Sequence, residues 1–469
     1  MNYGSLTRAL AILALLAVGC SDGPSGPYSD PDDDGSGDVA PAIVTWLQVN
    51  GKAFTTPEAG NGFADLQFLK RMVGDAKVVA LGEATHGTRE FFQMKHRLLE
   101  FLVEEMGFDL FAIEATWPEA NRLNEYVHGG EGDPSVLLSG LYFWTWNTRE
   151  VLEMIQWMRA HNEAPGGAPT VSFLGFDMQF PGMAIHNVIE YLSEVDSPAA
   201  AVASEKYSCM LRYANGPDGL TPSQTSYRDQ PRSYRDECQR DLEEVRDSLL
   251  AHQDTYEATS SAAEFAIADR SARVVLQYED IESERTRGAR DEFMAENAIW
   301  LHEQGGPDSK IVLWAHNGHV ADNPTYAGGS SMGWHLRAHY SDDLVTVGFD
   351  FYQGGFRAVH QTSNGGYAGV TNHTVGPAPV DSYEHYFHAA GKEQMILDIR
   401  SVDLTTASTS WLAGPLLMRS IGAVFAPTNP GAYLYPVTIP SRYDLVIFFD
   451  DTSAAEGLPY NPPNSWEGV

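Results

Sequence analysis

The chain has 469 residues, of which 43% are hydrophobic and 20% are charged, as is ordinary for a folded globular protein with a large core. Its 63 acidic and 30 basic residues give a formal net charge of -33, and such a surface repels the phosphates of nucleic acids and anionic lipid headgroups. We therefore expect no nucleic-acid partner.

Residues 1–20 have the features of an export signal. Arg8 precedes an apolar run at residues 9–18, which is shorter than the roughly 20 residues that a membrane-spanning helix needs but fits a signal-peptide core. The run leads to Gly19 and Cys20, and the segment resembles a bacterial lipoprotein signal, in which a small residue precedes the acylated cysteine. An ordinary secretory signal is the alternative. We expect an extracytoplasmic protein, in the periplasm or at the cell surface, whose membrane contact is a lipid on Cys20.

A flexible tether is predicted at residues 21–42, where Gly, Pro, Ser and Asp dominate and no apolar period occurs. We expect residues 43–469 to form one catalytic domain. Beyond Cys20 the chain has only Cys209 and Cys238, which could pair in an oxidising compartment, although their spacing neither requires nor forbids a disulfide.

From about residue 76, short apolar runs alternate with longer helical patterns, which is typical of an α/β fold with a mostly parallel sheet covered by helices. The predicted strands are residues 77–81, 108–113, 170–176, 310–315, 344–349, 394–399 and 444–449. An apolar stripe predicts a helix at 88–106, and further helices are expected at 149–159 and 181–195. A polar helical insertion at about 197–304, with a loop near 216–231, separates the two halves of the sheet.

Residues 78–86 and 311–319 echo each other. Each is a strand, then a polar residue, then a histidine three residues later, and each is followed further along by a strand that ends in an acid, Glu114 or Asp350. We hypothesise two pseudo-repeated halves that meet at one cleft. Chance similarity between short strands is the alternative.

Titratable side chains follow several predicted strands directly, namely Glu83, Glu114, Asp177, His316 and Asp350. Ligands of open α/β sheets bind beyond the carboxyl ends of the strands, so we expect a polar site at this rim. Imidazole accepts a proton near neutral pH, and a neighbouring carboxylate stabilises the imidazolium. His86 with Glu83 or Glu114 would meet that need, and His316 and His319 could stabilise an oxyanion.

Aromatic residues gather directly before a predicted helix, at Tyr142, Phe143, Trp144 and Trp146. Core packing is the ordinary role of such residues, and the alternative is an apolar wall, with Trp144 in contact with a bulky substrate. Arg149 follows them and could hold a substrate oxygen or pair with an acid.

Two other hydrolytic chemistries are possible. Residues 329–333 match the GxSxG pattern, but no strand precedes Ser331, so we interpret the match as a coincidence. The five residues proposed for the site are all competent metal ligands, and two histidines with one carboxylate are enough for catalytic zinc. The chain has no HExxH motif and no cysteine cluster, so no cofactor is predicted, while a metal-dependent hydrolase stays an alternative. A non-catalytic extracytoplasmic lipoprotein that binds a ligand or metal is another.

Several segments resemble the erythromycin esterase family. They are residues 81–87 (LGEATHG), 175–177 (GFD), 290–291 (RD), 294–297 (MAEN), 314–319 (WAHNGH) and 332–336 (MGWHL), together with Glu114. The resemblance spans about residues 60–450. It implies an esterase that opens the lactone of macrolide antibiotics, a reaction that confers antibiotic resistance, with a histidine-activated water and no serine nucleophile.

The same resemblance assigns roles residue by residue. His86 would be the general base and Glu114 its activating carboxylate, while Glu83, His316 and His319 would complete the pocket. Lys95 stands where the family tends to carry a basic residue. Together with Arg149, Trp144 and Asp177, Lys95 is expected to bind the substrate, a small-molecule ester.

Overall fold

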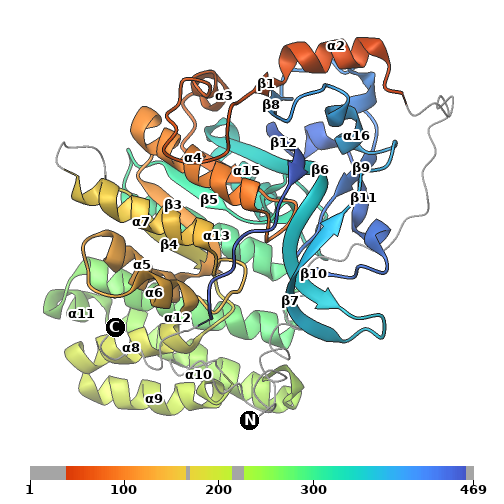
Figure 1. Cartoon of the computed structure of the whole chain (residues 1–469). Coiled ribbons are helices and arrows are strands. Elements are labelled where there is room, and N and C mark those ends of the chain that lie inside the picture. Colours follow the sequence, from red (N-terminus) through yellow and green to blue (C-terminus); the bar gives the residue numbers. More distant parts are fainter. Residues whose placement is uncertain (1–37, 165–169, 214–226, 461–469) are drawn as a thin grey trace.

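A ten-stranded, mostly parallel sheet runs through the molecule, with helices on both faces (Figure 1). The computed structural model describes residues 38–164, 170–213 and 227–460. The predicted signal peptide and residues 21–37 of the predicted tether lie outside this part of the chain. Within the described residues, α2 (Pro41–Asn50) begins at the end of the predicted tether, and no helix combines the length and apolar character needed to cross a membrane.

The main path of the sheet has the order β1-β8-β12-β6-β2-β5-β3-β4. These strands are β1 (Lys52–Ala53), β2 (Val78–Leu81), β3 (Leu110–Thr116), β4 (Ser172–Asp177), β5 (Ile311–Trp314), β6 (Leu344–Gln361), β8 (Gln394–Asp398) and β12 (Leu445–Thr452). Every predicted strand is present. β6 continues well beyond its predicted range because its second half pairs with β7 (Tyr367–Val375) and β10 (Val424–Phe425). A separate two-stranded sheet joins β9 (Leu416–Arg419) to β11 (Leu434–Val437).

The helices cover the two faces as separate layers. One layer contains α3 (Leu69–Val73), α4 (Arg89–Met106), α5 (Trp117–Val127), α6 (Pro134–Ser139) and α7 (Arg149–Glu163), and the other contains α8 (Gly182–Val195), α12 (Ala262–Ser283), α13 (Ala289–Gly305), α15 (Met332–Tyr340) and α16 (Tyr383–His388). The central strands β2 and β5 are buried along their whole length. This explains why their sequences, VVAL and IVLW, are continuously apolar instead of alternating.

The two echoing segments lie side by side at the centre of the sheet. β2 and β5 are parallel neighbours, in register from Val78 opposite Ile311 to Leu81 opposite Trp314. From β2 the chain passes through α4 on one face to β3, beyond β5; from β5 it passes through α15 on the other face to β6, beyond β2. The boundary between β2 and β5 is therefore a topological switch point, where ligands of such sheets bind.

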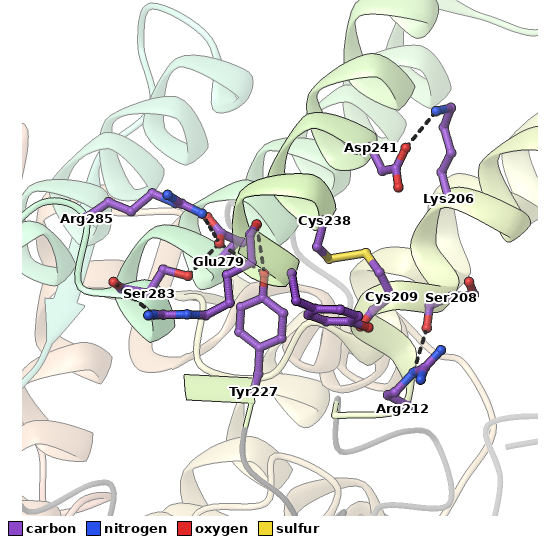
Figure 2. The surroundings of a disulfide bond; sticks show 12 residues. Lys206, Ser208, Cys209, Arg212, Tyr227, Cys238, Asp241, Glu279, Ser283 and Arg285 are labelled. Carbon is purple, nitrogen blue, oxygen red and sulfur yellow. Dashed lines mark hydrogen bonds and ion pairs between the residues drawn. A yellow bond between two sulfur atoms is a disulfide. The ribbon is translucent and has the colours of Figure 1, made fainter. Parts of the chain in front are cut away.

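A helical arm extends from one side of the sheet, at the bottom of Figure 1. It contains α8, α9 (Ser197–Leu211), α10 (Arg232–Ala251), α11 (Gln253–Thr259) and α12. A disulfide between Cys209 and Cys238 joins α9 to α10, which answers the question that the sequence left open (Figure 2). Of the predicted loop near 216–231, residues 216–226 lie outside the described residues.

Candidate active site

The five side chains proposed for the site gather around the switch point. Glu83 and His86 lie in the loop after β2, Glu114 lies in β3, and His316 and His319 lie at the end of β5 and in α14 (Asn317–Val320). The ring centroids of His86 and His316 are 5.0 Å apart, and those of His316 and His319 are 6.4 Å apart. All five are buried, and His86 is the most exposed at 7%. The two echoing segments therefore deliver their histidines to one place.

Glu83 fixes the tautomer of His86. Its Oε1 atom is 2.7 Å from Nδ1 of His86, while its Oε2 accepts hydrogen bonds from Lys95 Nζ at 2.6 Å and Trp314 Nε1 at 2.7 Å. A carboxylate only accepts, so Nδ1 of His86 carries the proton and donates it to Glu83. The lone pair of His86 is then on Nε2, the form that a general base requires.

Lys95 is buried and supports Glu83. Its side chain has no exposed surface, and its ammonium lies 4.2 Å from the centroid of the Trp314 ring. Burial lowers the pKa of Lys95 to about 8, and the Glu83 carboxylate opposes this shift. The structure shows Lys95 in a buried ion pair with Glu83, and its predicted contact with a substrate stays a prediction.

His316 presents a hydrogen-bond donor that has no partner. Its Nδ1 accepts the backbone N–H of Gly318 at 3.2 Å, so its proton is on Nε2. Burial lowers the pKa of His316 well below its ordinary value, and His86 and His319 lower it further, so the ring is neutral. The Nε2 atom is buried and has no hydrogen-bond partner in the described structure. A neutral N–H group of this kind can stabilise an oxyanion.

His319 is held between two carboxylates. Its Nδ1 is 2.8 Å from Asp291 Oδ1, and its Nε2 is 3.4 Å from Glu114 Oε1. Burial alone would lower the pKa of His319, but the Asp291 and Glu114 carboxylates outweigh it and raise the pKa. The pKa of His319 therefore lies above that of an ordinary histidine, although Nη1 of Arg290, 3.2 Å from Nε2 of His319, opposes the positive charge.

Arg290, at the start of α13, was not among the predicted site residues. Its guanidinium donates from Nη2 to Glu114 Oε1 at 2.8 Å and to Asp177 Oδ2 at 2.7 Å, and from Nε to Asp177 Oδ1 at 3.2 Å. Asp177 is fully buried, and both its oxygens contact Arg290. Asp177 therefore orients Arg290, and its predicted contact with the substrate stays a prediction.

Glu114 does not occupy the position that the resemblance implied. The hydrogen-bonded partner of His86 is Glu83, because three residues of loop after β2 bring both side chains together. Glu114 accepts instead from Arg290 and from the backbone N–H of His316 at 3.0 Å. Burial alone would raise the pKa of Glu114, but His319 and Arg290 outweigh it and hold the pKa well below its ordinary value. Glu114 thus links the second strand to the His316 segment.

The aromatic stretch contributes through Trp146. Its ring centroid lies 6.0 Å from that of His86, and its Nε1 donates to the backbone carbonyl of Glu114 at 2.9 Å. Trp144 is half-buried and approaches Arg357. Arg149 is exposed and pairs with Glu456 at 2.7 Å, so of its two expected roles the structure shows the pairing with an acid.

A C-terminal strap, residues 453–459, crosses two loops of the site. The backbone N–H of Ala455 donates to the carbonyl of Gly87 at 3.0 Å, next to His86. The side chain of Asn147 donates to the carbonyl of Leu458 at 3.2 Å. The strap therefore ties the His86 loop to the loop that carries Trp146.

Ser331 is not placed as a nucleophile. No strand precedes it, and its Oγ accepts the backbone N–H of Trp334 as the N-cap of α15. Asp350 is likewise outside the site, because β6 continues past it; burial and the neighbouring Glu384 raise its pKa well above the ordinary value.

The site does not fit a metal. Among the described residues, no three His, Cys, Asp or Glu side chains are arranged to hold an ion. Glu83 is bonded to Lys95, and Glu114 is bonded to Arg290. A bound cation would have to displace these ammonium and guanidinium groups from the same oxygens.

Comparison with known proteins agrees with the motifs. The family model described as Erythromycin esterase matches residues 103–452. Erythromycin esterase type II of Escherichia coli is 25% identical over 341 residues, which are 67% of this chain and 78% of that protein. The putative hydrolase YbfO of Bacillus subtilis (strain 168) is 23% identical over 388 residues, 79% of this chain and 84% of that protein.

Solved structures share the fold. A protein from Bacillus cereus is 25% identical with a TM-score of 0.77, and a succinoglycan biosynthesis protein is 24% identical with a TM-score of 0.75; each comparison covers 89% of this chain and 98% of the other. The open conformation of an erythromycin esterase mutant, EreC, is 17% identical with a TM-score of 0.66, over 85% of this chain and 96% of that one.

Proposed function

The chain belongs to the erythromycin esterase family, which indicates a hydrolase, and from that premise we propose that it cleaves a carboxylic ester with a water molecule activated by His86. The observation that carries the proposal is the pairing of two neighbouring imidazoles in complementary states. The proton of His86 is held on Nδ1 by Glu83, and that of His316 is on Nε2 without a partner.

These states define the steps of the reaction. A water oxygen attacks the ester carbonyl while Nε2 of His86 takes its proton, and Glu83 stabilises the resulting imidazolium. The oxyanion of the tetrahedral intermediate accepts a hydrogen bond from Nε2 of His316 and lies in the field of the His319 charge. When the intermediate collapses, the carbon–oxygen bond to the alcohol breaks, and the proton on His86 passes to the leaving oxygen. The products are a carboxylic acid and an alcohol.

A bulky ester such as a macrolactone is the substrate class that we propose. The Escherichia coli relative is named an erythromycin esterase, and Trp146 lines the site next to His86. The test is a panel of macrolides and activated esters incubated with the protein, with the products measured by mass spectrometry. We expect the products to gain one water mass. The rate of their formation should fall by about three orders of magnitude in His86→Ala. An unchanged ligand that raises the melting temperature would identify a binding protein instead.

We also propose that the protein is exported and anchored through a lipid on Cys20. Two observations support this: the signal-like residues 1–20 and the disulfide between Cys209 and Cys238, a bond that persists in oxidising compartments. Radiolabelled palmitate fed to producing bacteria should label the protein but not Cys20→Ala. Equal labelling of both proteins would refute the anchor.

A further inference from the structure

An arginine without a counter-ion lies next to the His86 loop. Arg357 is on β6, and its backbone N–H donates to the carbonyl of Gly87 at 2.9 Å. A Cβ atom on Gly87 would lie 2.7 Å from Cβ of Arg357, so only a glycine allows these two segments to touch. Arg357 is therefore in contact with the residue that follows the proposed general base.

The guanidinium of Arg357 has unused donors. Its Nη1 is buried without a hydrogen-bond partner, and among the described residues Arg357 forms no ion pair. The other two cations of the site differ, because Lys95 pairs with Glu83 and Arg290 pairs with Asp177.

A second unused donor lies beside it. The guanidinium carbon of Arg357 is 5.8 Å from the centroid of the Trp144 ring, and Nε1 of Trp144 is also buried without a partner. Trp144 and Trp146 belong to one short segment, and Trp146 contacts His86. One unused donor thus comes from the segment that carries Trp146, and the other comes from β6, which contacts the His86 loop at Gly87.

Without a bound ligand, the positive charge of Arg357 is electrostatically unfavourable. Burial lowers the pKa of Arg357, and the Glu150 carboxylate opposes this shift. Glu150 does not reach Arg357, because its oxygens accept from Arg89 at 3.2 Å and from the backbone N–H of Glu456. A partly buried cation without a partner is unfavourable, and an incoming anion would remove that penalty.

We propose that Arg357 and the Nε1–H of Trp144 bind a carboxylate carried by the substrate, so that the preferred esters are acidic ones. This proposal rests on the ester hydrolysis proposed above and selects a class among the bulky esters. The coplanar N–H groups of a guanidinium match the two oxygens of a carboxylate, which gives both affinity and orientation. The ester group would then be oriented toward His86 by an anchor at the opposite end of the acyl chain.

The test uses pairs of substrates that differ only in this charge. Mono-4-nitrophenyl esters of succinic, glutaric and adipic acid have a free carboxylate at the far end. Each is compared with the diester in which that carboxylate is a methyl ester. For the chain length that fits, the wild type should prefer the acid, and Arg357→Gln should reduce that preference in kcat/KM by about 10- to 100-fold. The readout is this ratio of acid to methyl ester, because a general disturbance of the His86 loop would lower both rates together. Arg357→Lys keeps the charge but loses the paired N–H groups of the guanidinium, and Trp144→Phe removes one donor. Each should therefore lose part of the preference for the acid.

Binding separates this proposal from the proposed hydrolysis. The mono-4-nitroanilides of the same acids resist cleavage, and their affinities are measured by isothermal titration calorimetry. Arg232, an exposed arginine on the helical arm, supplies the control Arg232→Gln, which should match the wild type. The acid anilides could bind more tightly than their methyl esters, and lose that preference in Arg357→Gln, while no ester is cleaved. This result would support the carboxylate site and refute the esterase activity. Equal treatment of acids and methyl esters by the wild type, or an unchanged preference in Arg357→Gln, overturns the site.

Discussion

Replacing Glu83 with Gln separates the chemical role of this carboxylate from its role in stability. Three donors, His86, Lys95 and Trp314, converge on its two oxygens. A glutamine amide has one accepting oxygen and one donating nitrogen, so it cannot satisfy all three. If its oxygen faces His86, its NH₂ meets Lys95 and Trp314; if its NH₂ faces His86, the imidazole is forced into the wrong tautomer.

The expected losses follow from these contacts. A wrong tautomer at an acid–histidine pair costs about four orders of magnitude in rate, so kcat of Glu83→Gln should fall by 10³- to 10⁴-fold. Lys95 also becomes a buried charge without a partner, which destabilises a fold by about 3–5 kcal/mol. The double variant Glu83→Gln/Lys95→Met removes that charge and should recover most of the stability, but none of the activity.

The stability loss has a defined pH dependence. Without Glu83, which raises the pKa of Lys95, that pKa falls below about 8 in the folded variant, while it stays near 10.5 in the unfolded chain. At a pH below the pKa of Lys95 in the folded variant, the full loss of stability is present. Above it, the unfolded variant binds more protons than the folded one, so the gap to the wild type narrows by about 1.4 kcal/mol per pH unit until pH 8.

Urea denaturation between pH 5 and 9 measures the stability, and ester hydrolysis measures the rate. The reasoning is refuted if Glu83→Gln keeps its activity within tenfold of the wild type. It is also refuted if the double variant is no more stable than the single one.

Three further predictions concern other contacts. Asp291 helps to raise the pKa of His319, so activity should decline as pH rises through that pKa. Asp291→Asn should move this alkaline limb of the pH–rate profile to lower pH. An unmoved limb would exclude a role for the charge on His319 in the reaction. Replacing Cys209 and Cys238 with Ser opens a covalent loop of 29 residues in sequence separation, which should cost roughly 3–4 kcal/mol of stability in urea titrations while ester turnover stays the same. Ser331→Ala should lose about 1 kcal/mol as a missing helix cap and keep its rate within a factor of a few, whereas a rate near zero would restore the serine as nucleophile.

The sheet and the place of the site follow from patterns that are local in the sequence. Strands such as 78–81 and 311–314 are short apolar runs, and the carboxyl ends of parallel strands meet at one rim. Glu83 and His316, which follow two such runs, could therefore be placed together from the sequence. The disulfide could not, because it depends on how α9 and α10 pack.

Residues that act from outside the strand ends were harder to predict. Arg290 starts a helix far along the chain, and Trp314 ends a strand in a way that looks like ordinary core. A charge argument would have pointed to Arg290, since Glu114 and Asp177 at one buried rim need a cation. The exchange between Glu83 and Glu114 as partner of His86 depends on side-chain direction, which spacing does not fix.

The C-terminal strap makes the timing of synthesis matter. When synthesis has reached residue 452, both histidine-bearing segments have been made. The chain still lacks the backbone groups of Ala455 and Leu458, which hydrogen-bond to the two loops. These groups are main-chain atoms, so point substitutions leave them in place while exopeptidases remove them. Gradual trimming by a carboxypeptidase should therefore inactivate the protein at a stretch that takes no part in the chemistry.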